Sequence, residues 1–187
     1  MTTGQSTKGS SGSFSLSSFD AGTAGVSGSL TFQSGKSTVG NSGAVTIVTG
    51  DARFGRAGSF NVVVGNGDSG KGGSIFMSSG STSGTSGTTG GDVTVATGSS
   101  SRTSSGNMFL STVNGGTAGV SGRISMTTGV STFGNAGSIT LSTGQSTVAG
   151  RGGGMFLSTG TSVAGNGAVV IVGAGETTAA AGTGGVI

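Results

Sequence analysis

The sequence predicts an all-β fold, a parallel β-solenoid of twelve coils that are each about 15 to 16 residues long. Three observations predict it. Apolar residues recur in pairs with one residue between them, a glycine stands at a fixed distance before each pair, and side chains between the glycines alternate with a period of two. Together they indicate two stacked sheets of short strands, with glycine at the corners and aliphatic side chains inside.

The apolar pairs set the length of the repeat. Ile139 and Leu141 form one such pair, and in an extended strand both point to the side opposite Thr140 and Ser142. The first members of successive pairs are 14 to 18 residues apart, and we expect the pairs to fill a thin core. The pairs are Phe14/Leu16, Leu30/Phe32, Val45/Ile47, Phe60/Val62, Ile75/Met77, Val93/Val95, Met108/Leu110, Ile124/Met126, Ile139/Leu141, Met155/Leu157 and Val169/Ile171, and Val186 opens a twelfth.

A glycine stands two residues before the first member of every pair. These glycines are Gly12, Gly28, Gly43, Gly58, Gly73, Gly91, Gly106, Gly122, Gly137, Gly153, Gly167 and Gly184. A position that always takes glycine requires either a positive φ or a close approach of the backbone, so we interpret these residues as structural corners. In eight repeats a second glycine lies three residues earlier, as Gly134 does, which predicts a tight turn. Residues beside these turns, such as Val39 and Phe54, are expected to face back toward the pairs.

A longer period lies above the short one. Residues 22–28 recur unchanged at 116–122, which predicts a single domain, 1–187, made of two six-coil super-repeats at about 1–94 and 95–187. Joining Ile187 to Met1 continues the repeat in register, and neither end has a capping element. Because open strand edges promote pairing, we expect a segment of a longer solenoid that is either covalently continuous or stacked head to tail.

The composition excludes most chemistry. The chain has no Cys and no His, so it lacks thiolate and imidazole groups for catalysis or metal binding. Five acidic residues are scattered, and no coil contains two of them. We therefore predict no enzyme activity, no catalytic residue, no cofactor and no metal. Eight basic residues form no cluster, which argues against binding to nucleic acid, and no apolar run is long enough to span a membrane.

Two other folds compete with the solenoid. Gly, Ser and Thr make up more than half of the chain, as in a flexible linker or a disordered tract, but such a tract would not hold glycine at one position in twelve repeats. A polyproline-II bundle requires glycine at every third position, which the sequence does not show.

Six residues are candidates for a lateral contact face. Phe76, Phe109 and Phe156 each stand between two residues expected to point inward, so the alternation points them outward. Val48, Val63 and Val172 point outward by the same count. The alternative is that the strand flips locally or that a loop covers the rings.

Ser and Thr residues precede the closing corner of most repeats, for example Thr112 and Thr159. We expect their hydroxyls to bond along the stack. Two alternatives stay open: O-linked glycan on outward Ser and Thr, and ice binding by rows of Thr. The row between the apolar pairs is interrupted by three Phe and an Asn, which argues against ice binding.

Coils of this length with glycine corners and inward Val, Ile and Leu resemble parallel β-solenoids. More narrowly, they resemble the Gly/Ser/Thr-rich repeats of long surface or extracellular proteins of microbes and unicellular algae. The resemblance implies an extracellular or cell-surface location. We predict a structural protein that forms a stiff filament by association with itself, end to end and laterally. The alternative is an adhesin-like module or a solenoid that binds ice or glycan.

Overall fold

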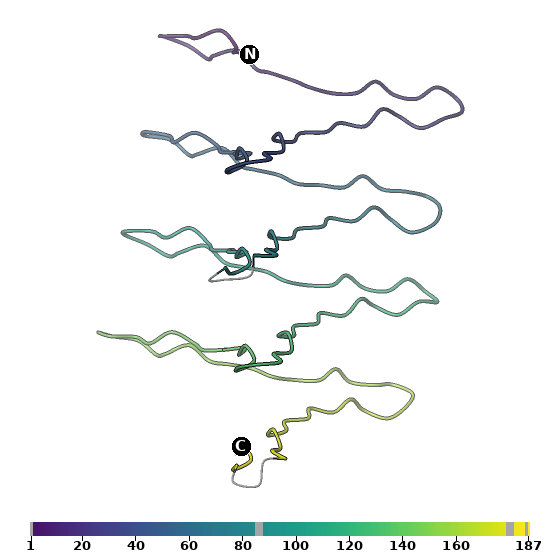
Figure 1. The fold of residues 1–187 in the computed structure, drawn as a ribbon, viewed down its shortest axis with the longest axis vertical. Helices are drawn as coiled ribbons and strands as arrows, with labels where there is room; N and C mark the ends of the chain where they lie inside the picture. The colour runs from purple at the N-terminus through teal and green to yellow at the C-terminus, as the bar shows by residue number, and fades with distance from the viewer. Residues whose placement is uncertain (1, 85–87, 179–181, 186) are drawn as a thin grey trace. The chain divides into compact units, whose positions relative to one another are not determined.

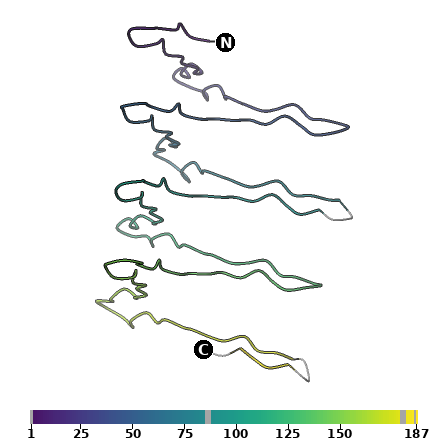
Figure 2. The same ribbon diagram turned by 90° about the vertical axis from the view of Figure 1, so that its left-hand side faces the viewer.

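A computed structural model describes residues 2–84, 88–178, 182–185 and 187 of the chain. Over these residues the backbone consists of extended segments, bends and one turn at 117–118, with no helix and no strand (Figure 1). The chain divides into two units, Met1–Thr94 and Val95–Ile187. Each unit is a succession of narrow loops in which two limbs of the chain run side by side (Figures 1 and 2).

The predicted all-β, parallel β-solenoid is therefore wrong for the part of the chain that the structure describes. A strand requires hydrogen bonds to a neighbouring strand, and the extended segments here have no such partner. Alternation with a period of two determines which way side chains point in an extended segment, but it does not supply the partner. Without a sheet there are no stacked sheets, and none of the described side chains is buried in a core.

The repeat nevertheless has a structural counterpart, because bends recur about once per repeat. They lie at 7–9, 23–25, 38–40, 53–55, 68–71, 101–103, 117–119, 132–134, 147–150 and 163–165, the one at 117–119 being part turn. The tight turn expected at the second glycine is confirmed at Gly25, Gly40, Gly70, Gly134 and Gly150, where φ lies between 70° and 142°. This left-handed region is open to glycine at little cost, so the bend depends on the missing side chain.

The corner glycines lie at the base of the loops. Gly153 N donates a hydrogen bond to Gly144 O at 3.0 Å, and Gly106 N donates one to Gly98 O at the same distance. The same bond closes the loops at Gly12 and Gly91, and Gly185, beside corner Gly184, closes the last one. None of the twelve corner glycines has φ in the left-handed region. Of the two reasons the sequence offers for glycine here, close approach is the one that applies.

Close approach is visible in what a side chain at a corner would meet. A Cβ on Gly153 would lie 3.0 Å from Thr143 Cβ, and one on Gly122 would lie 3.3 Å from Thr112 Cβ. The Ser or Thr before the closing glycine thus packs against the corner glycine of the same loop. Gly167 is the exception, since no atom lies within 4 Å of its added Cβ.

Hydrogen bonds stay within single loops. The backbone–backbone bonds of the described residues join partners 3 to 11 positions apart, so none runs from one repeat to the equivalent position of the next. The Thr112 hydroxyl donates to Gly122 O at 3.1 Å, and the Thr159 hydroxyl donates to Ala168 O at 3.4 Å. The expectation that such hydroxyls bond along a stack is wrong at these two residues, because each bonds across the base of its own loop.

Several predictions concern residues outside the described ranges. Met1 and Val186, which carry the expected continuation of the repeat from one end into the other, belong to this group, as do parts of the connections at 81–89 and 176–181. The two super-repeats stay a prediction from the sequence.

Candidate association surface

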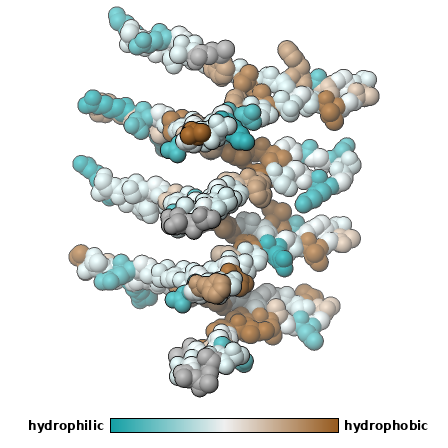
Figure 3. Space-filling model, in the orientation of Figure 1, coloured by the Kyte–Doolittle hydropathy of each residue, from teal (hydrophilic) through white to brown (hydrophobic). Residues whose placement is uncertain are grey.

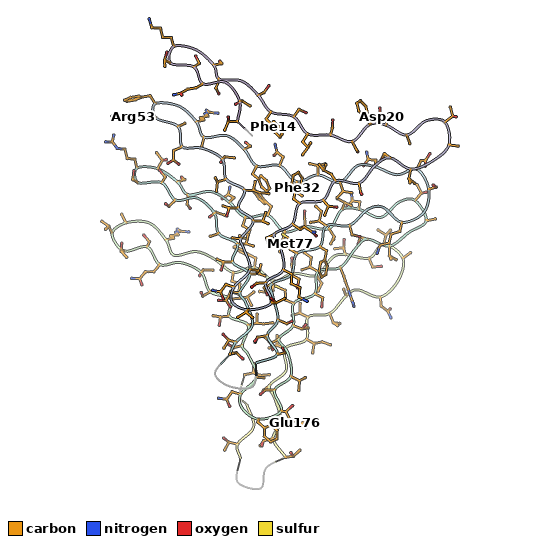
Figure 4. The ribbon with its side chains drawn as sticks, turned by 45° about the horizontal axis from the view of Figure 1, so that its top comes forward. Phe14, Asp20, Phe32, Arg53, Met77 and Glu176 are labelled. Atoms are coloured by element: carbon orange, nitrogen blue, oxygen red, sulfur yellow. The ribbon has the colours of Figure 1, made fainter. Side chains whose placement is uncertain are left out.

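The apolar pairs are the least exposed apolar side chains of most repeats, yet they remain open to solvent. Their first members are between 50% exposed, at Met108, Ile139 and Met155, and 73% exposed, at Val169. Figure 4 shows Phe14, Phe32 and Met77 away from the loop ends, whereas Arg53 lies at a loop end. The pairs therefore do not form the thin core that the alternation predicts. They form a half-covered apolar strip at the loop bases, which we call the pair strip.

The last described pair departs from this order. Val170, which the alternation points outward, is 54% exposed, whereas its neighbours Val169 and Ile171 are 73% and 85% exposed. The apolar run at 169–172 has no polar residue between its members, so nothing in the sequence fixes which side chains turn toward the base.

The residues predicted to form a lateral face are all exposed. Phe76, Phe109 and Phe156 are 87%, 85% and 93% exposed. Val48, Val63 and Val172 are exposed as well. Phe76 belongs to the first unit, and Phe109 and Phe156 belong to the second. Their role as a shared contact face stays a prediction.

Apolar side chains also stand at the loop ends. Phe54, Phe133 and Val163 are almost fully exposed, and Val39 is 93% exposed. The expectation that these residues face back toward the pairs is wrong, because each one lies in or next to a bend, where both limbs turn away from the base. Hydrophobic surface is consequently open to solvent in many separate patches (Figure 3).

Phe54 is the one described residue other than glycine with a positive φ, at 63°. The next residue, Gly55, keeps a negative or extended φ, so the left-handed conformation at this bend falls on the aromatic residue itself. The Arg53 guanidinium lies 5.4 Å from the centre of the Phe54 ring, a cation–π distance. The sequence pattern gave no sign of this contact, since it places glycine, not phenylalanine, at the strained position.

The described residues show no arrangement suited to catalysis or metal binding. Acidic side chains nowhere come together in a group of three that could hold a metal ion. Pockets are absent from the described part as well. No helix among the described residues is long and apolar enough to cross a membrane.

Comparison with known proteins gives no match: no family model matches the chain, and neither a curated protein nor a solved structure is similar to it. The resemblance to solenoid repeats of microbial and algal surface proteins is thus unsupported by any family. It is also contradicted by the absence of strands from the described residues.

Proposed function

We propose that this protein is structural and that its copies associate through their repeated apolar surfaces into a filament outside the cell. The observation that carries the proposal is the exposure of apolar side chains in every repeat without any core among the described residues. Large exposed apolar surface is a mark of association in soluble proteins. The low charge acts in the same direction, because a net charge of +3 over 187 residues provides little repulsion between copies.

The composition supports the location and a modification. Gly, Ser and Thr dominate the sequence, and the described Ser and Thr are exposed, apart from the half-covered Ser37. Their hydroxyls are available as acceptors for O-linked glycan. Mass spectrometry of the native protein tests this directly, since each sugar adds a fixed mass to an identified hydroxyl.

Filament formation is tested with the full chain. Sedimentation over a wide range of concentration, followed by electron microscopy of the fastest species, should show elongated assemblies whose amount rises with concentration. A chain that sediments as a monomer at every concentration, and shows no filament by microscopy, contradicts the proposed function.

A second function, a binding module such as an adhesin, is favoured by one observation. The rings of Phe76, Phe109 and Phe156 are exposed although they do not lie at loop ends. Phe109→Ser separates the two functions, with Phe133→Ser as its control because Phe133 is an equally exposed ring at a bend. If the chain is a binding module, Phe109→Ser abolishes attachment to surfaces or glycans and leaves filaments intact, whereas Phe133→Ser changes neither.

A further inference from the structure

The exposed area of the chain is far larger than a single folded chain of this size has. The solvent-accessible area is 18700 Å². A folded monomer of 17.3 kDa exposes about 7,800 Å², and the unfolded chain about 25,000 Å². The excess over a folded monomer is therefore about 11,000 Å², more than ten times the roughly 800 Å² that each partner buries in a standard interface. One small ligand or one ordinary docking patch cannot cover an excess of this size.

The composition argues against a chain that simply stays unfolded. Disordered segments combine low hydrophobicity with high net charge. Here the mean hydropathy is +0.17 and charged residues are 7% of the chain. The loop bases also recur in register, with the same glycine-to-glycine bond at Gly12, Gly91, Gly106 and Gly153. The chain thus has apolar surface to bury and a regular frame that presents it.

We propose that the pair strip is covered by the pair strips of further copies of the same chain, so that a core forms only between copies. This inference rests on the proposed function and names the surface that it uses. A partner for the strip must present apolar side chains at the same interval of 14 to 18 residues. The chain itself meets this requirement, and its segment 22–28 recurs unchanged at 116–122, so one copy offers the same surface at two places.

Backbone groups point to the same occupant. Extended segments such as 124–126 and 139–141 have no backbone hydrogen bond to a neighbouring repeat. When the pair strip is covered, the N–H and C=O groups beside it lose their water, and an unpaired buried group is costly. A second extended segment of the same kind provides both the apolar side chains and the backbone partners, which a globular surface of side chains does not.

The test removes two apolar residues from the pair strip and compares the result with the removal of two from a neighbouring bend. Ile124→Ser with Ile139→Ser changes side chains that are 52% and 50% exposed, at the bases of successive loops. The control, Val130→Ser with Phe133→Ser, lies between them and changes side chains that are 99% and 97% exposed. Sedimentation equilibrium of each full-length variant gives the association constant, and amide hydrogen exchange shows which segments become protected at high concentration.

We expect the Ile124/Ile139 variant to lose at least tenfold in association constant, and the control variant less than about threefold. In the unaltered protein, exchange at 124–126 and 139–141 should slow as the concentration rises. Filaments that form with exchange at these segments unchanged, or that survive the loss of Ile124 and Ile139, overturn this inference and leave the proposed function standing. A chain that stays monomeric at every concentration overturns both. Slow exchange that is independent of concentration also overturns the inference, because it would place the core within one chain.

Discussion

Replacing a corner glycine by alanine tests whether the glycines close the loops, and the structure gives two positions with opposite surroundings. At Gly153 an added Cβ would lie 3.0 Å from Thr143 Cβ, and the amide donates the 3.0 Å hydrogen bond to Gly144 O. At Gly167, the equivalent position of the next repeat, nothing lies within 4 Å. Neither glycine has φ in the left-handed region, so alanine is free of backbone strain at both.

The expected difference follows from two opposing effects. Alanine restricts the open chain and thereby favours the closed loop by about 0.4–1 kcal/mol at either position. At residue 153 the methyl group pushes the limbs apart, and the loss of one hydrogen bond costs about 0.5–1.5 kcal/mol. Gly153→Ala should therefore be less favourable than Gly167→Ala by about 1 kcal/mol, which is a factor of about five in the ratio of closed to open loop.

The assay is amide hydrogen exchange at residue 153 in both variants, at a concentration where the chain is monomeric. Gly153→Ala should exchange about fivefold faster than the unaltered protein, after correction for the intrinsic rate of alanine, and Gly167→Ala should leave Gly153 unchanged. Equal exchange in all three proteins would refute the assignment of close approach as the reason for glycine at the corners.

Two further predictions concern single contacts and the solvent. Arg53→Gln removes the cation from the Phe54 ring, so the three-bond coupling that reports φ of Phe54 should shift toward the value of ordinary extended backbone. Arg56→Gln, two residues beyond Phe54, should leave that coupling unchanged, and an equal response to both would count against the cation–π contact. Self-association should respond little to sodium chloride, since few charges are present to be screened, and should strengthen in sulfate, which favours apolar burial. A steep loss of association in sodium chloride would mean that charges, not the pair strip, hold the copies together.

The sequence predicts the repeat well but not its partner. The bends at Gly25, Gly40 and Gly134 follow from glycine spacing alone, because positive φ is a local property of one residue. The base contact between Gly122 and Thr112 is foreseeable as a close approach for the same reason. Pairing of Ile139 with an equivalent residue of another repeat is a non-local event, and the alternation around Ile139 is the same whether that partner comes from this chain, from another copy or is absent.

The exposed loop ends show a second limit of the pattern. Val39, Phe54 and Phe133 are apolar, and apolar residues are usually placed inside when a sequence is interpreted. Each of them, however, lies within a bend, where the chain reverses and both limbs lead back to the base. The position relative to the turn glycine decides the outcome, and for Phe54 it even forces the left-handed conformation onto a bulky residue.

The length of the loops explains how an uneven repeat can still present an even surface. The loop closed by Gly91 and Gly80 is three residues longer than the loop closed by Gly106 and Gly98, yet both bases have the same hydrogen bond, at 2.9 and 3.0 Å. Lengthening a flexible loop from 8 to 11 positions costs only about 0.3 kcal/mol of closure entropy. The extra residues are thus absorbed at the loop end, while the corner glycine and the apolar pair after it keep their local relation. The pair strip, which needs regular spacing to meet another copy, is built from the invariant part of each repeat, and the variable part points away from it.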